Sequence, residues 1–131
     1  MDSPDIRWKQ RFQQYEKAFV LLKEAIAIKH LSKIERAGLI QCFEMALELG
    51  WKLLKDFQEA EGFTIKTPRE SIKQAFQANI IEHGHDWLDA LEDRNLTSHV
   101  YQEKIALEVE NKIRTKYYLL LENLYKNFKV K

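Results

Sequence analysis

The chain has 131 residues, of which 45% are hydrophobic and 31% charged, a composition that excludes an intrinsically disordered protein. The 21 Lys and Arg residues against 20 Asp and Glu residues leave a net charge of +1, so overall charge gives no argument for binding nucleic acid or a membrane. A single cysteine excludes an intrachain disulfide and a cysteine-based zinc site, and no apolar run is long enough to span a membrane. We therefore expect one cytoplasmic domain over residues 1–131, with no cofactor and no metal.

Apolar residues at helical spacing predict a long first helix. They recur in steps of three and four residues, as one face of an α-helix requires: Trp8, Phe12, Tyr15, Phe19, Leu22 and Ile26. Ser32 and Glu35 then fit a capping box, in which the serine oxygen accepts from a free backbone N–H and the glutamate reaches back. A second helix is therefore expected to begin just after Ser32.

The second predicted helix carries two apolar rows side by side. One row is Ile40, Phe43, Leu47, Gly50, Leu54 and Phe57, and the other is Leu39, Cys42, Ala46, Leu49 and Leu53. A surface helix of a small bundle needs only one such row. This helix is thus either the central helix of the bundle or also buries a face against another subunit. In both cases Cys42 is expected to be a buried, unreactive thiol.

Glycine and proline divide the middle of the chain. Gly62 ends the second helix, and Thr67 and Pro68 begin a third one, with Glu70 placed to complete a second capping box. This third helix is short and fades before Gly84, which marks a break.

A further helical piece around Trp87 and Leu91 leads to the last helix, which runs from about Gln102 to Phe128. Helical spacing dominates the whole chain, and clusters of β-branched residues with a period of two are absent. The sequence therefore predicts an all-α fold, an antiparallel four-helix up-and-down bundle with an extra short helix.

Residues 94–101, Arg-Asn-Leu-Thr-Ser-His-Val-Tyr, are the densest group of chemically capable side chains. On a regular helix Arg94 and His99 are separated by about 140° around the axis, whereas Asn95 and His99 share a face. Thr97 can hydrogen-bond to nearby backbone and bend the helix, as can the serine that follows it. Arg94 and His99 therefore need a local irregularity, or a second subunit, to act together.

Arginine and histidine together suffice, in principle, to cleave RNA without a metal. The planar guanidinium of Arg94 can hold the non-bridging phosphate oxygens, and His99 can exchange a proton near neutral pH with the 2′-hydroxyl or the leaving oxygen. Asn95 can orient either the histidine or the phosphate. A polar helix start with these residue types is nevertheless more often structural than catalytic, so both interpretations stay open.

Two other groups of polar residues are weaker candidates for a site. His83 and His85, with Glu82 or Asp86, resemble a set of metal ligands, although two histidines around a glycine are more often a solvated loop. The carboxylates Glu92, Asp93 and Glu103 can act as acid and base or can simply balance Arg94.

Several enzyme classes lack their signatures in this chain. It contains no glycine-rich phosphate loop, no Ser–His–Asp arrangement in a recognisable context and no "GS" signature of a nucleotidyltransferase. The chain is therefore not expected to be a nucleotidyltransferase itself.

Four segments, "RWKQRFQQYEKAFVLLKEAI", "GLIQCFEMALELGWKLLKDF", "TPRESIKQAF" and "WLDALEDRNLTSHVYQE", follow one another as in a known family. In this order the chain resembles the nucleotidyltransferase substrate-binding protein family from about Ile6 to Phe128. That family is similar to the C-terminal helical domain of kanamycin nucleotidyltransferase and belongs to the HEPN superfamily of helical bundles. The resemblance implies a homodimer that associates with a minimal nucleotidyltransferase (MNT) subunit.

The resemblance also implies roles for the residues of "RNLTSHVY". Arg94, Asn95 and His99 match the HEPN signature, which in toxins resembles a ribonuclease site composed across a dimer interface. Tyr101, two residues beyond the histidine, matches the tyrosine to which an MNT partner transfers AMP.

Two functions follow from the resemblance. The chain is either a metal-independent RNase toxin that is inactivated by adenylylation of Tyr101, or a non-catalytic subunit whose Arg94 and His99 bind a nucleotide or substrate phosphate. We favour the first, because phosphate binding alone requires no histidine that titrates near neutral pH. A simple dimerisation scaffold would leave the full set of residues unexplained.

Overall fold

The computed structural model describes residues 4–131, and over that range every regular element is a helix. The elements are α1 (Pro4–Ile26), α2 (Lys33–Ala60), α3 (Pro68–Gln77), α4 (Gly84–Asp93), the 3₁₀-helix η1 (Arg94–His99), α5 (Glu103–Lys112), the π-helix η2 (Ile113–Tyr117) and α6 (Tyr118–Lys129). The last three are consecutive parts of one long helix, so the predicted helical bundle is confirmed. None of the helices in the described range is long and apolar enough to cross a membrane.

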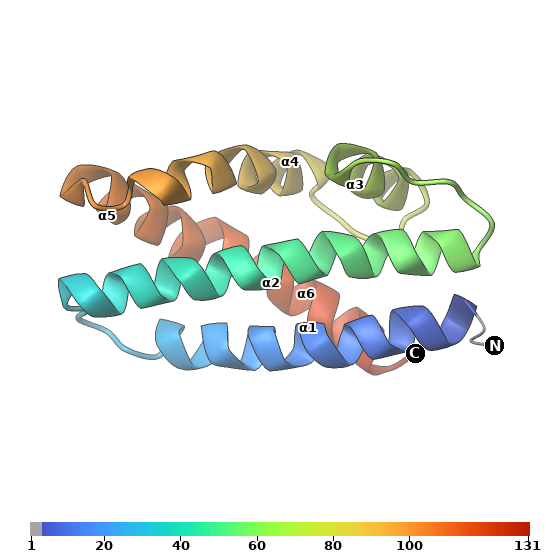
Figure 1. Ribbon diagram of the computed structural model, residues 1–131, viewed down its shortest axis with the longest axis horizontal. Coiled ribbons are helices and arrows are strands. Elements are labelled where there is room, and N and C mark those ends of the chain that lie inside the picture. The colour runs from blue at the N-terminus through green and yellow to red at the C-terminus, as the bar shows by residue number, and fades with distance from the viewer. Residues whose placement is uncertain (1–3) are drawn as a thin grey trace.

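Helix α2 lies at the centre of the bundle. It packs against α1 on one side and α3 on the other, and the last helix crosses behind it (Figure 1). Residues of both apolar rows are buried, and a Cβ on Gly50 would lie only 3.3 Å from the side chains of Tyr15 and Leu124. The central position within one chain therefore accounts for both rows, and they do not by themselves indicate a subunit interface.

The ends of the helices follow the predicted capping chemistry with one difference. Glu35 N–H donates to the Ser32 hydroxyl over 3.1 Å and Ser32 N–H donates to the Glu35 carboxylate over 2.9 Å, so the first capping box is complete. At α3 the Thr67 hydroxyl accepts from Glu70 N–H, but the Glu70 carboxylate accepts from Lys66 N–H over 2.8 Å. Thr67 therefore caps α3 as predicted, but the other half of the second capping box is wrong. Glu70 bonds to the N–H of Lys66, which lies one residue before the cap, instead of to that of Thr67.

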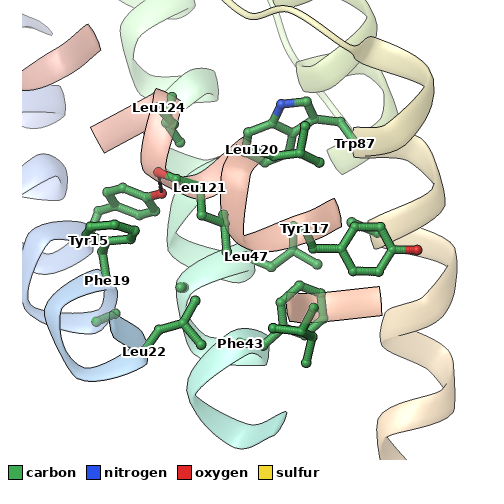
Figure 2. Packing of buried hydrophobic residues seen from close by; sticks show 14 of the residues in the cluster. Tyr15, Phe19, Leu22, Phe43, Leu47, Trp87, Tyr117, Leu120, Leu121 and Leu124 are labelled. Atoms are coloured by element: carbon green, nitrogen blue, oxygen red, sulfur yellow. Dashed lines mark hydrogen bonds between the residues drawn. The ribbon is translucent and has the colours of Figure 1, made fainter. Parts of the chain in front are cut away.

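The π-helix in the last helix has a visible cause in the sequence. Val109, Ile113 and Tyr117 are all buried and lie four residues apart. In a regular α-helix each four-residue step rotates by about 40° away from the buried face, and a wider turn removes that drift. After the π-turn, Leu120, Leu121 and Leu124 fill the core beside α2 (Figure 2).

The connection between α3 and α4 is closely packed. Asn79 adopts a positive φ of 60° just after α3, and Ile80 N–H then donates to the Ala75 carbonyl over 2.9 Å. Gly84 is the first residue of α4, where an added Cβ would lie 2.8 Å from the ring of Phe76. The break predicted at Gly84 is therefore made by Asn79, while Gly84 lets α4 begin against α3.

Candidate functional site around the 3₁₀-helix

The chain changes from α-helix to 3₁₀-helix at Arg94, where the candidate residues begin. The Thr97 hydroxyl donates to the Arg94 carbonyl over 2.7 Å, and the Ser98 hydroxyl lies 3.5 Å from the Asn95 carbonyl. These side chains bond to carbonyls three residues earlier, which supports the tighter turn. The local irregularity expected in this stretch is thus present.

The tighter turn does not bring the arginine to the histidine. With about three residues per turn, successive residues are separated by about 120°, so Arg94 and His99 still point in different directions. Asn95 and His99, which would share a face of an α-helix, no longer do. Within residues 4–131 no hydrogen bond joins His99 to Arg94 or Asn95, and the exposed imidazole lies 6.3 Å from the ring of Tyr101.

Arg94 is balanced by a carboxylate that the sequence did not indicate. Its Nη1 atom donates to the Glu48 carboxylate of α2 over 3.2 Å. Neither of two expected partners pairs with Arg94 among residues 4–131: Glu92 is exposed and makes no ion pair, and Glu103 is 4.0 Å from Lys33. Glu48 is 46 residues before Arg94, so local spacing contained no signal for this pair.

Asp93 is held by the last helix. It accepts a short hydrogen bond from the Tyr117 hydroxyl and one of 3.1 Å from Lys112 Nζ. Figure 2 shows the Tyr117 hydroxyl directed away from the core towards the chain segment that contains α4 and η1. Burial and the neighbouring Asp93 carboxylate raise the pKa of Tyr117 well above its usual value. Asp93 therefore fixes the end of α4, immediately before Arg94, rather than serving as a free acid or base.

Tyr101 differs from the other four tyrosines in the state of its hydroxyl. Its side chain is 78% exposed, and its hydroxyl oxygen accepts a hydrogen bond from Gln102 Nε2 over 3.3 Å. The remaining tyrosine hydroxyls donate to the Leu121 carbonyl and to the carboxylates of Asp93, Glu122 and Glu16: those of Tyr15, Tyr117, Tyr118 and Tyr125. Among the five tyrosines, Tyr101 is thus the one that is largely exposed and whose hydroxyl proton is donated to no acceptor in residues 4–131.

Arg94 and Tyr101 line two different grooves. The α3–η1 groove, of about 410 Å³, is lined by residues 67–69 and by Leu91, Glu92, Arg94 and Asn95. The α2–α5 groove, of about 380 Å³, includes Ile34 and Ala37 of α2 together with Val100 and Tyr101. One chain therefore presents the arginine and the tyrosine on separate surfaces.

The remaining candidate residues do not form a site. His83 adopts a positive φ of 57° before α4, and His85 is exposed with Nε2 3.7 Å from Asp89. In residues 4–131 no group of three or more His, Cys, Asp or Glu residues is placed to hold a metal ion. Cys42 is buried as predicted, and burial raises the pKa of its thiol, which keeps the thiol protonated.

Comparison with known proteins supports this architecture. The model of a family described as nucleotidyltransferase substrate binding protein like matches residues 10–130. A Thermus thermophilus protein of known crystal structure is 31% identical and superimposes with a TM-score of 0.77, over 84% of this chain and 94% of that one. The comparison with curated proteins gives no match.

Proposed function

Because the chain belongs to the nucleotidyltransferase substrate binding protein like family, we propose that it works with a separate MNT-type nucleotidyltransferase that adenylylates Tyr101. The observation that carries the proposal is the exposed hydroxyl of Tyr101, whose proton is donated to no group in the described chain. In the reaction, the tyrosine oxygen attacks the α-phosphorus of ATP and the new P–O bond replaces the bond to pyrophosphate. The phenolic proton passes to a base of the partner enzyme or to solvent.

The unmodified protein is, in this proposal, a metal-independent ribonuclease toxin. Arg94 holds the scissile phosphate with Asn95 in support, and His99 moves a proton between RNA and solvent. Since Arg94 and His99 point in different directions on η1, the site requires two copies of the chain in a homodimer, with RNA bound between them. Adenylylation of Tyr101 then places a phosphate and a nucleoside on the surface that RNA approaches.

A second function is favoured by a separate observation. The α3–η1 groove contains Arg94 and Asn95 but not His99, so phosphate can be bound there without a catalytic histidine. In this alternative the chain is a non-catalytic subunit that binds a nucleotide or substrate for its partner nucleotidyltransferase, as the family description implies.

RNA cleavage by the purified protein separates the two functions. The toxin proposal predicts that the wild type cuts RNA in the presence of EDTA, whereas His99→Ala and Arg94→Ala leave it intact. Incubation with the partner and ATP should abolish cleavage by the wild type but not by Tyr101→Phe. A wild-type protein that leaves RNA uncut, and that does not slow growth when expressed alone, would contradict the toxin proposal and favour the binding subunit.

A further inference from the structure

We propose that the α3–η1 groove is a nucleotide-binding site in which Arg69 is the second guanidinium, beside Arg94, that binds the phosphate. This inference rests on the proposed role of Arg94 as a phosphate ligand and adds a residue from a different helix. Arg69 lies in the first turn of α3, 25 residues before Arg94, and no sequence motif connects the two.

The groove has the size and the lining of a small-ligand site. Its volume of about 410 Å³ lies within the range of about 300–1,000 Å³ that is usual for such sites. Pro68 supplies most of the apolar surface for a flat base, since Leu91 also lines the groove but is largely buried. Arg69, Arg94 and Asn95 supply polar groups around it.

The two guanidinium groups have most of their donors free. Arg94 donates to Glu48 through Nη1, and its Nη2 and Nε atoms donate to no acceptor in residues 4–131. Arg69 is exposed and makes no hydrogen bond or ion pair within the described chain. Two planar donor groups that line one groove suit a phosphate, whose oxygens accept paired hydrogen bonds from arginine.

Thr67 and Asn95 add uncharged donors to the same groove. The Thr67 oxygen accepts from Glu70 N–H to cap α3, which leaves its hydroxyl proton free to donate. The Asn95 amide is exposed and can donate or accept. These groups recognise phosphate and sugar oxygens without adding charge.

Glu92 indicates which phosphate compound the groove prefers. Glu92 lines the groove and pairs with no cation in residues 4–131, so its negative charge repels a bare phosphate ion. A carboxylate accepts hydrogen bonds from sugar hydroxyls, as in sites that bind a ribose. We therefore expect a nucleotide to bind more tightly than inorganic phosphate.

Titration of isotope-labelled protein with AMP, followed by NMR, tests the site. AMP should shift the backbone amide signals of Thr67, Arg69 and Asn95, and inorganic phosphate should shift the same signals only at higher concentration. Arg69→Ala should weaken AMP binding about tenfold, since it removes a charge-assisted hydrogen-bonding group. Arg7→Ala is the matched control, because Arg7 is also exposed and unpaired among residues 4–131 but does not line the groove. It belongs to α1, which lies on the opposite side of α2 from α3 (Figure 1).

Two further arms identify the source of the phosphate and sharpen the test. A short single-stranded DNA, which lacks the 2′-hydroxyl and cannot be cleaved, should displace AMP if the groove binds a nucleic-acid strand and should not do so if it binds free nucleotides. Glu92→Gln should bind inorganic phosphate more tightly than the wild type, because a repelling charge is removed.

The inference is overturned if AMP leaves the groove signals unchanged, or if Arg69→Ala and Arg7→Ala bind AMP equally well. These results are distinct from failure of the proposed function. RNA cleavage and Tyr101 modification without AMP binding in the groove would overturn the groove alone, whereas AMP binding in the groove without RNA cleavage or Tyr101 modification would overturn the proposed function alone.

Discussion

Two pairs of arginines in this protein use their donors in opposite ways. Arg36 and Arg114 clamp Glu110 with N–O distances of 2.7 and 2.8 Å, and Arg114 also donates to the carbonyls of Ile26 and Ile28 over 2.8 and 2.7 Å. Arg94, in contrast, donates to Glu48 alone, and Arg69 donates to no group in the described chain.

The difference separates arginines that hold the fold from arginines that are available to a ligand. Arg114 ties the end of α1 and the following loop to the last helix, so its donors are already satisfied by protein. The donors of Arg69 and Arg94 are left to solvent or to a bound group. All four residues are arginines, so residue type cannot separate the two groups. The number of guanidinium N–H donors that no protein group accepts from separates them.

Arg114→Ala should have the largest effect on stability. It leaves the carbonyls of Ile26 and Ile28 without their donor and removes one of the two cations on Glu110. We expect the free energy of unfolding to fall by about 3 kcal/mol, measured by urea denaturation. A loss below about 1 kcal/mol would show that Arg114 contributes little to the fold, and would contradict the distinction between arginines that hold the fold and arginines that are available to a ligand.

Tyr117→Phe tests whether the hydrogen bond between Tyr117 and Asp93, next to Arg94, stabilises the fold. The change removes the hydroxyl that donates to Asp93 and leaves that carboxylate with Lys112 as its remaining partner. Unfolding in urea should show a loss of about 2 kcal/mol. Tyr125→Phe, which removes a hydroxyl bonded to Glu16, is the matched control and should lose less free energy of unfolding. Equal losses in the two variants would contradict a special role for the hydrogen bond between Tyr117 and Asp93.

Glu110→Gln should lower stability in a manner that depends on pH. Burial opposes ionisation of Glu110, but the hydrogen bonds from Arg36 and Arg114 outweigh it and hold the pKa of Glu110 below the usual 4.5. The charged form therefore stabilises the folded state above about pH 4.5, and this contribution is lost as the pH falls through the lowered pKa.

Thermal unfolding of the wild type and Glu110→Gln measures that dependence. At pH 7 the variant should be less stable by about 1 kcal/mol, and the gap should narrow as the pH falls below about 4.5. A gap that stays constant between pH 7 and pH 3 would show that ionisation of Glu110 does not matter.

Arg69→Ala should have the smallest effect on stability. The side chain is exposed and unpaired within residues 4–131, so the free energy of unfolding should change by less than about 0.5 kcal/mol. Circular dichroism during thermal unfolding of Arg69→Ala, the wild type and Arg114→Ala measures this difference in stability. A loss comparable to that of Arg114→Ala would mean that Arg69 serves the fold.

The fold was predictable because its signals are local and periodic. Ser32 with Glu35, and Thr67 with Pro68, start helices where their chemistry requires, and the apolar rows of α2 follow the core. The four-residue spacing of Val109, Ile113 and Tyr117 is also typical of the π-helix, although a regular helix was expected there.

The site was less predictable because its contacts join distant segments. Arg94 meets Glu48 of α2 and shares a groove with Arg69 of α3, and neither pairing has a signature in local spacing. The bend from Thr97 and Ser98 was foreseen, but it separates Asn95 from His99 instead of uniting the motif. Three-dimensional packing alone distinguishes the free hydroxyl of Tyr101 from the bonded hydroxyls of the other tyrosines.

The most direct test of Tyr101 as the modified residue is to locate the AMP group after incubation of the protein with its nucleotidyltransferase partner and ATP. Mass spectrometry of the intact chain and its peptides should find one adenylyl group, attached to Tyr101, and none on Tyr101→Phe. Tyr118→Phe, which removes a hydroxyl bonded to Glu122, should be modified like the wild type. Modification of another residue, or equal modification of Tyr101→Phe, would contradict the proposed role of Tyr101.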